Sequence, residues 1–251
     1  MEPTRALVRE PGDTYTSCIS SHPQHHSVDL NKARAQHARY CAVLSDLGLE
    51  VIRVPRDDLH PDACFVEDNA VVFGDKALIC RMAKESRRGE QPGVAAVLEE
   101  YVKIKWAEAP ATIEGGDVVH LGDRLISGVT ERTNLEGVAQ LRNWLGVRVD
   151  TIDDPEIMHL KSYVTSLGRG RVVATKKYAR HPALDGLDVL VIPEGEEYAA
   201  DTLTVGDTVL MPGGYPRSHE MVRGAGYEVI PMDVGEIEKC DGALTCLSIL
   251  F

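Results

Sequence analysis

The segment DNAVVFGDKALIC, residues 68–80, decides the fold because it is one copy of a pattern that recurs along the chain. Two short alternating strands meet at the turn Gly74-Asp75, which predicts a β-hairpin. Similar segments have their turns at Gly122-Asp123, Gly168-Arg169-Gly170 and Gly206-Asp207. Self-similarity at a spacing of roughly 40 to 48 residues indicates a repeat fold.

A second repeat runs out of phase with the hairpins. In it a helical stretch is followed by glycine or aspartate and then by a β-branched strand, as in residues 47–55, 145–153, 186–193 and 225–233. Each module is therefore predicted to contain a hairpin, a helix and a strand. A lone hairpin cannot bury its apolar face, so the modules must pack on one another.

The two ends of the sequence supply a further module if they pair. Residues 4–10 read TRALVRE, and residues 244–251 read LTCLSILF. Their pairing closes the ring and leaves no long exposed edge. We therefore expect an α/β fold, a fivefold pseudo-symmetric propeller of ββαβ units, with residues 1–251 forming a single domain.

Length and composition exclude several classes of protein. With 251 residues, 43% of them apolar, the chain is long enough for one well-cored domain. No apolar run approaches the ~18 residues that span a bilayer, and MEPTRALVRE lacks the apolar core of a signal peptide, so we expect a cytoplasmic protein. The net charge of −12 argues against nucleic acid and favours a cationic or zwitterionic small ligand.

The cysteines show neither a CxxC pair nor the spacing of a disulfide framework, which is typical of a reducing compartment. Each is therefore expected to be a core residue or a nucleophile. They are Cys18, Cys41, Cys64, Cys80, Cys240 and Cys246.

Three amphipathic stretches predict helices. The first runs from about Asp29 to Leu47, with Gly48 as a C-terminal cap and with His37 and Cys41 interpreted as core residues. Val94, Val97, Leu98 and Tyr101 mark the second. A capping box, Thr133-Asn-Leu-Glu136, predicts the start of the third, which has Leu135, Val138, Leu141 and Leu145 on one face and ends at Gly146.

Polar residues stand at equivalent positions of the repeat and are harder to explain as structure. Glu67-Asp68 opens one hairpin, Glu114-Gly-Gly-Asp117 opens the next, and His159 precedes the third, while Cys246 lies inside the last predicted strand. Equivalent ends of propeller modules converge on the axis, so we expect one central pit. A thiolate within reach of a histidine is a nucleophile and acid–base pair. Alone, each of these residues reads as a buried or turn residue; their coincidence favours a catalytic site.

Six motifs follow one another along the sequence. They are PDACFVEDNAVV (61–72), SRRGE (86–90), EGGDVV (114–119), SGVTERTN (127–134), MHLKS (158–162) and DGALTCLS (241–248). In this order and spacing they resemble the dimethylarginine dimethylaminohydrolases of the guanidine-modifying (pentein) superfamily, and the resemblance runs from about Val28 to the end of the sequence. A lone Glu-Gly-Gly-Asp is a weak signal, but six motifs in order are a strong one. The resemblance implies a fivefold ββαβ propeller, in agreement with the repeats.

The resemblance implies a role for each matching residue. Cys246 is the expected nucleophile, His159 the acid–base and Glu114 its carboxylate partner. The expected substrate contacts are Asp68 and Glu67 for the guanidinium, Arg87 and Arg132 for the α-carboxylate, Asp62 for the α-amino group, Asp241 beside the nucleophile, and Leu30. Arg81 is an alternative to Arg87.

The implied reaction is hydrolysis of Nω-methylated L-arginine. Carboxylates hold the guanidinium as a cation, the cysteine attacks its central carbon, and the histidine protonates the departing amine. Water then releases citrulline from the S-alkylthiouronium. No metal or organic cofactor is expected. The partner is a small-molecule guanidino amino acid rather than nucleic acid or membrane, with a homodimer left open.

The sequence leaves one segment and two other functions open. His22-Pro-Gln-His25-His26 reads either as a metal-binding tract or as the substrate-covering loop of the family, and we expect the loop and no metal. The same chemistry can serve arginine or another guanidine, although an agmatine-type substrate leaves Arg87 and Arg132 unpaired. A non-catalytic propeller is a third hypothesis, which the combination of Cys246 and His159 argues against.

Overall fold

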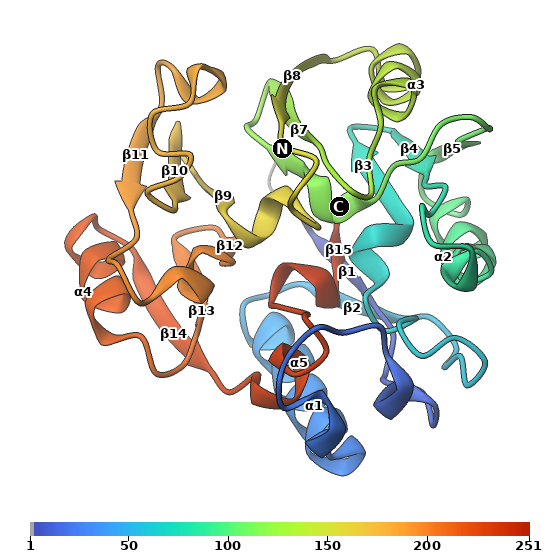
Figure 1. The fold of residues 1–251 in the computed structure, drawn as a ribbon, viewed down its shortest axis with the longest axis horizontal. Helices are drawn as coiled ribbons and strands as arrows, with labels where there is room; N and C mark the ends of the chain where they lie inside the picture. The colour runs from blue at the N-terminus through green and yellow to red at the C-terminus, as the bar shows by residue number, and fades with distance from the viewer. Residues whose placement is uncertain (1–2) are drawn as a thin grey trace.

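The structure of the chain is a computed structural model that describes residues 3–251. Within these residues the strands form five sheets of three, and each sheet repeats one arrangement. A central strand pairs antiparallel with the strand on one side and in parallel with the strand on the other. The modules follow one another around the molecule in chain order, as Figure 1 shows.

The five sheets are built from strands that are two to six residues long. They are β15 (Ile249–Leu250), β1 (Arg5–Val8) and β2 (Glu50–Arg53); β3 (Ala70–Phe73), β4 (Lys76–Ile79) and β5 (Lys103–Trp106); β6 (Val118–His120), β7 (Arg124–Val129) and β8 (Arg148–Asp153); β9 (Val164–Gly168), β10 (Arg171–Ala174) and β11 (Asp188–Val191); and β12 (Leu203–Val205), β13 (Thr208–Pro212) and β14 (Glu228–Met232).

All four predicted hairpins are confirmed, and so is the pairing of the two ends. Gly74 adopts a φ of 61° between β3 and β4, a left-handed conformation that glycine tolerates best. In the remaining sheet β15 lies antiparallel to β1, with Ala6 opposite Leu250. The Phe251 carbonyl also accepts hydrogen bonds from the Thr4 and Arg5 amides at 2.9 and 2.8 Å.

The three predicted helices form, and two of them lie close to their expected bounds. The second ends at Leu98, so Tyr101 lies beyond it and is 40% exposed, contrary to the prediction. α1 begins after Asp29, whose carboxylate accepts hydrogen bonds from two amides of the first turn. His37 and Cys41 are buried on it, as expected. The helices are α1 (Leu30–Asp46), α2 (Gln91–Leu98), α3 (Leu135–Leu145), α4 (Pro216–Gly224) and α5 (Gly235–Glu238).

The start of α3 differs from the prediction. Asn134, and not Thr133, caps it by accepting from the Gly137 amide at 2.8 Å, because the Thr133 hydroxyl donates to Asp117 instead. Leu135 is 62% exposed and does not belong to the apolar face. Gly146 ends the helix in a left-handed conformation, as predicted.

Two further expectations about the modules are wrong in detail. Between β10 and β11 the chain forms a short 3₁₀ turn, Pro182–Leu184, in place of a helix. Cys246 lies in a 3₁₀ turn, Thr245–Leu247, immediately before β15 and not inside the strand. β5 was not predicted, because no glycine or aspartate precedes it as in the other strands of the second repeat.

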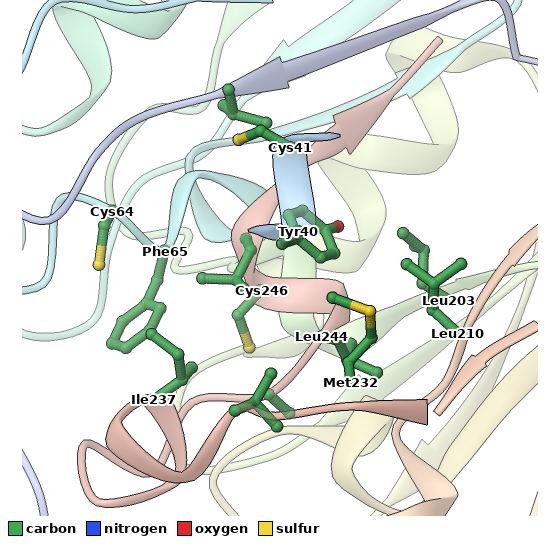
Figure 2. Packing of buried hydrophobic residues seen from close by; sticks show 14 of the residues in the cluster. Tyr40, Cys41, Cys64, Phe65, Leu203, Leu210, Met232, Ile237, Leu244 and Cys246 are labelled. Carbon is green, nitrogen blue, oxygen red and sulfur yellow. The ribbon is translucent and has the colours of Figure 1, made fainter. Parts of the chain in front are cut away.

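The largest apolar cluster surrounds α1 and the segment that carries Cys246. Tyr40 and Leu44 of α1 belong to this cluster, as do Ile237 and Leu244. Cys246 is also a member, and Figure 2 shows its side chain between Phe65 and Leu244. The Tyr40 hydroxyl also contacts Ser248 Oγ at 2.7 Å. The core thus fixes the chain on the C-terminal side of Cys246. Of the helices in residues 3–251, none combines the length and the apolarity needed to cross a membrane.

The expectation that the cysteines are reduced is wrong for two of them, although both are buried in the core as predicted. Cys18 and Cys240 form a disulfide, with their Cα atoms 5.9 Å apart and a sequence separation of 222. Sequence spacing could not indicate this bond, because the fold alone brings the two residues together. Cys41, Cys64, Cys80 and Cys246 are free and buried.

Candidate active site

A 3₁₀ turn stands directly before the first strand of each module, and these turns carry the predicted polar residues. The turns before β15, β3, β6, β9 and β12 contact one another in that order. Asp201, which follows the last of them, accepts from the Thr245 amide at 2.9 Å and so joins it to the first. The turns are Thr245–Leu247, Val66–Asn69, Gly115–Asp117, Leu160–Ser162 and Glu197–Ala200.

These turns and the loops beside them enclose one pocket. Its volume of about 20 Å³ leaves room for about one water molecule. The lining includes most of the predicted site residues together with others that the sequence did not single out. Predicted residues in the lining are Asp62, Asp68, Arg87, Arg132, His159, Asp241 and Cys246; the others are Ile19, Phe65, Met158, Cys240 and Gly242.

His159 lies beside two carboxylates, both of which are near its Nε2 atom. Its Nε2 lies 2.8 Å from Glu114 Oε2 and 3.7 Å from Asp68 Oδ1. Burial lowers the pKa of His159, but the charge of Asp68, the hydrogen bond to Glu114 and the charge of Asp117 outweigh it and raise that pKa to about 9. The ring is therefore an imidazolium at neutral pH, and its Nε2–H donates to Glu114.

Asp117 positions the histidine without facing the pocket. Its two carboxylate oxygens accept from the Leu160 amide at 2.9 Å and from the Thr133 hydroxyl at 2.6 Å. The turn that begins at His159 is thereby fixed to the neighbouring module. The EGGD motif thus supplies one carboxylate that touches the histidine and one that holds its backbone.

Arg87 is saturated by protein carboxylates. Its Nη1 lies 2.9 Å from Asp68 Oδ2, while its Nε and Nη2 donate to the two oxygens of Glu90, both at 2.9 Å. All three side chains are buried. The guanidinium therefore orients Asp68 and has little capacity left for a further anion.

Arg132, in contrast to Arg87, has side-chain nitrogens that no protein carboxylate binds at hydrogen-bond distance among residues 3–251. Its Nη1 lies 3.7 Å from Glu114 and its Nε 3.8 Å from Glu131, both too far for a hydrogen bond. Among residues 3–251 neither atom has a hydrogen-bond partner, although both are buried. Leaving such donors unsatisfied is costly, so Arg132 is poised to bind an anion that enters the pocket.

Three expected substrate residues lie outside the pocket lining. Glu67 pairs with Lys161 at 2.5 Å. Leu30 begins α1 and packs against the main apolar cluster, outside the closed pocket, so its contact with substrate stays a prediction. Arg81 donates to the Ala111 carbonyl at 3.0 Å and does not compete with Arg87.

Asp62 and Asp241 both hold the segment that precedes α1. Asp62 accepts from the Ile19 amide at 3.1 Å. Asp241 accepts from the Ser21 amide at 2.6 Å and has an unusual positive φ of 54°. In this closed arrangement both carboxylates are occupied by backbone donors that a ligand's amino group can replace.

Cys246 is buried beside carboxylates. Burial raises the pKa of its thiol well above the ordinary value, and the charges of Asp201, Asp68 and Glu67 raise it further. At neutral pH the free protein therefore holds a thiol. A cation brought into the pocket opposes these negative charges and favours the thiolate.

The sequence reasoning missed Asp201, although this residue opens the hairpin segment 201–212. Its carboxylate accepts from both the amide and the hydroxyl of Thr245, at 2.9 and 3.0 Å. Burial, followed by the charge of Glu67, raises the pKa of Asp201 to about 7. A signal was present, because acidic residues occupy the same place before β3 and β6.

Replacing Asp201 by asparagine is expected to make Cys246 more reactive. The amide keeps an acceptor for Thr245 but removes a negative charge that opposes the thiolate. Alkylation of Cys246 by iodoacetamide, followed by mass spectrometry, should be roughly 3- to 10-fold faster in the variant at pH 8. At pH 6, where Asp201 is protonated in the parent, the two rates should agree. An equal gain at both pH values would attribute the effect to a structural change.

Asp68, Glu114 and His159 also have the spacing of a metal site, with ligand atoms within 4.8 Å of one another. Arg87 Nη1, however, lies 2.9 Å from Asp68 and 3.6 Å from Glu114. Two protein cations, Arg87 and the imidazolium, therefore already balance these carboxylates. The arrangement suits a cationic substrate better than a divalent ion.

Comparison with known proteins matches this geometry to one family. Residues 10–175 match the family model for N,N dimethylarginine dimethylhydrolase, eukaryotic. An N(G),N(G)-dimethylarginine dimethylaminohydrolase from Streptomyces coelicolor is 38% identical over 99% of this chain and 97% of its own length. The chain belongs to the dimethylarginine dimethylaminohydrolase family. A relative of the same name from Pseudomonas aeruginosa is 34% identical over 99% of this chain and 96% of its own.

Solved structures of dimethylarginine dimethylaminohydrolases share the fold. A variant of the Pseudomonas aeruginosa enzyme, complexed with citrulline, superposes with a TM-score of 0.96 over 100% of both chains, at 31% identity. Another structure holds an adduct with S-methyl-L-thiocitrulline and gives a TM-score of 0.95 over 99% of this chain and all of its own, also at 31% identity. The family assignment from the six motifs is thereby confirmed.

Proposed function

We propose that this chain hydrolyses Nω-methylated L-arginine, dimethylarginine in particular, to L-citrulline and a methylamine. The observation that carries the proposal is that one pocket contains the thiol of Cys246, the imidazolium of His159 and the guanidinium of Arg132. Nε and Nη1 of this guanidinium have no hydrogen-bond partner among residues 3–251. The citrulline complex of a relative supports this choice of product.

The substrate guanidinium is held near Asp68 and Glu114. Charge-assisted hydrogen bonds from its nitrogens keep the cation intact and its central carbon electrophilic. Arg87 fixes Asp68 from the other side, so the carboxylate is already oriented when substrate arrives. The substrate also brings positive charge to Cys246, which then releases its proton to solvent and becomes a thiolate.

Two chemical steps follow. The Cys246 sulfur forms a bond to the guanidinium carbon while the bond from that carbon to the methylated nitrogen breaks. The imidazolium of His159 gives its proton to the departing amine, leaving a thiouronium on the enzyme. Neutral His159 then takes one proton from water, whose oxygen attacks the same carbon. The C–S bond breaks and the second proton of the water passes to solvent, which yields the ureido product and the thiolate.

Arg132 is proposed to bind the substrate α-carboxylate, and Arg132→Ala tests this role. KM for dimethylarginine should rise by about one to two decades, since a charge-assisted contact is worth roughly 1.5 to 3 kcal/mol. The loss of kcat should be smaller, because the contact is remote from the reacting carbon. A decarboxylated analogue of dimethylarginine is the control and should lose little. An equal loss for both substrates would make Arg132 structural.

The substrate itself is tested by a panel of guanidino compounds scored for ureido product. Dimethylarginine should give the highest kcat/KM among methylated arginines, arginine, agmatine and guanidinosuccinate. Preference for unmethylated arginine would leave the reaction class intact and change the substrate. No turnover of any member by folded protein would contradict catalysis and favour a binding protein of the same fold.

The contacts between successive turns and the β1–β15 pairing support a closed fivefold propeller formed by one domain. We propose this architecture because it explains how residues from different modules reach the same pocket. Assembly into a homodimer and a place in the cytoplasm stay predictions.

A further inference from the structure

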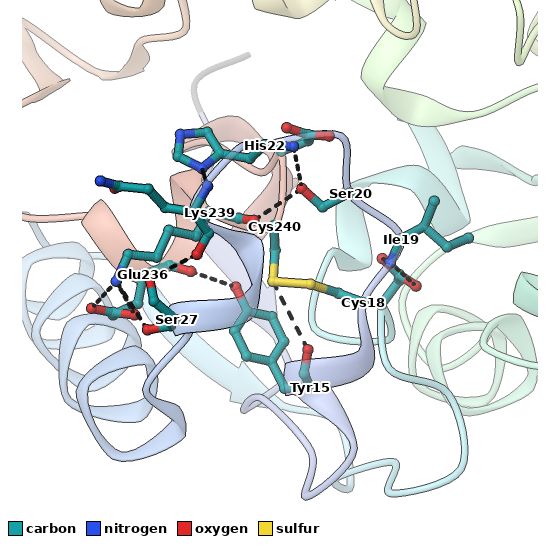
Figure 3. Close-up of a disulfide and its surroundings, with 12 residues drawn as sticks. Tyr15, Cys18, Ile19, Ser20, His22, Ser27, Glu236, Lys239 and Cys240 are labelled. Carbon is teal, nitrogen blue, oxygen red and sulfur yellow. Dashed lines mark hydrogen bonds and ion pairs between the residues drawn. A yellow bond between two sulfur atoms is a disulfide. The ribbon is translucent and has the colours of Figure 1, made fainter.

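The segment of residues 15–28, which we call the covering loop, closes one side of the pocket. Ile19 lies in the pocket lining, and Ser20 Oγ donates to the Lys239 carbonyl at 2.9 Å. The disulfide from Cys18 to Cys240 ties this loop to the chain segment that follows α5 (Figure 3). Cys240 also lines the pocket. Because the closed pocket has room for about one water, entry of an amino acid requires this loop to move.

His25 completes a cluster with the disulfide. A ring nitrogen of His25 and the sulfurs of Cys18 and Cys240 all lie within 4.8 Å of one another. The His25 Nε2 atom is buried and has no hydrogen-bond partner among residues 3–251. A buried ring nitrogen without a hydrogen-bond partner is unfavourable, so this nitrogen is available to bind a further group.

We propose that reduction of the Cys18–Cys240 disulfide creates a binding site for one divalent cation of the zinc class, with the two cysteine sulfurs and His25 as ligands. Thiolate and imidazole are the donors that zinc favours, and three protein ligands leave a fourth tetrahedral position for water. The site is separate from the catalytic pair, because neither Cys246 nor His159 belongs to the cluster.

The chemistry of the conversion balances with an external reductant. A phosphine or dithiol supplies two electrons, two protons convert the sulfurs to thiols, and the reductant is oxidised. The cation then displaces the two thiol protons. Zn–S bonds of about 2.3 Å place the sulfurs about 3.7 Å apart in a tetrahedral site. That separation is compatible with Cα atoms 5.9 Å apart.

The cation therefore has the same mechanical effect as the disulfide. Either one ties the covering loop to Cys240 at the pocket wall. In the reduced, metal-free protein, hydrogen bonds such as those from Ile19 and Ser21 are the polar contacts left to hold the loop. Access to the pocket thus depends on both thiol oxidation and the availability of the cation.

The test uses the full chain carrying Cys246→Ser, which removes the pocket thiol as a competing ligand. After reduction with a phosphine and removal of the reductant, the protein is titrated with Co²⁺. One equivalent should produce thiolate-to-cobalt absorption and the intense visible bands of tetrahedral cobalt, and Zn²⁺ should abolish both. The oxidised protein should show neither signal.

Substitutions in the same background locate the site. Cys18→Ser should abolish the charge-transfer signal at one equivalent, and His25→Gln should weaken Zn²⁺ binding by at least about 10-fold in competition with a chromophoric chelator. His22→Gln and Cys41→Ser are the matched controls and should bind as the parent does. Circular dichroism establishes that each variant is folded.

A protection experiment needs no substitution in the cluster. Stoichiometric Zn²⁺ should slow maleimide labelling of Cys18 and Cys240 in the reduced protein, as read by mass spectrometry. Absence of the cobalt signal in folded, reduced protein, or unchanged binding in Cys18→Ser, would overturn the proposal and leave the disulfide as a crosslink only. The outcome is independent of the proposed hydrolase activity, because turnover is not measured.

Discussion

Cys246→Ser is expected to reduce turnover by on the order of 10⁴-fold or more, the scale on which removal of a covalent nucleophile acts. The substitution is nearly isosteric, but a hydroxyl at this position is far less acidic than a thiol and is a much poorer nucleophile. The surroundings that raise the thiol pKa, burial and the carboxylates of Asp201 and Asp68, oppose an alkoxide even more strongly. Citrulline formation measures the loss.

Stability and a matched thiol separate this effect from unfolding. The thermal midpoint of Cys246→Ser should stay within a few degrees of the parent, because volume is conserved. Cys41→Ser is the control, since Cys41 is also buried but lies on α1 outside the pocket. It should keep near-parental turnover. Substantial citrulline formation by folded Cys246→Ser would remove this residue from the mechanism.

His159→Ala is expected to lose about 10²- to 10⁴-fold in turnover, the usual contribution of a general acid–base. Both steps suffer, because the same ring protonates the departing amine and later takes the proton of the attacking water. S-methyl-L-thiocitrulline distinguishes these two roles. Its leaving group is a thiolate, which needs protonation less than an amine does, so only the hydrolysis step should still depend on His159. The variant should form the covalent adduct with this compound and release it slowly.

A second variant at this position controls for charge. Removing the imidazolium leaves Glu114 and Asp68 without one of their cations, which can destabilise the protein. His159→Gln keeps an N–H donor for Glu114 but cannot shuttle protons, so it should restore stability more than turnover. Parental rates in either variant would show that another group moves the protons.

The repeats and the family motifs were readable in the sequence because their signals are local. A glycine turn between two alternating strands specifies a hairpin within a dozen residues, and all four predicted hairpins formed. The missing helix between β10 and β11 shows the limit of this reasoning. The repeat predicts a helix between these strands by analogy with the other modules. The local sequence around Pro182 forms a 3₁₀ turn there instead.

The parts of the site that could not be predicted depend on contacts distant in sequence. Arg87 and Arg132 had the same predicted role. The fold shows that Arg87 is paired with Glu90 and Asp68. Two buried nitrogens of Arg132, in contrast, have no hydrogen-bond partner among the described residues. The bond between Cys18 and Cys240 spans 222 residues and has no local signature.

The pairing of β1 with β15 also sets an order on the ribosome. Translation delivers Ala6 long before Leu250, the residue that lies opposite it in the antiparallel strand. The nascent polypeptide therefore carries an unfinished first sheet while the later modules emerge and fold. His159, Glu114 and Arg132 are all translated before Cys246. A chain that stops before residue 246 contains the three charged side chains but lacks the sulfur, so it cannot trap a guanidine covalently.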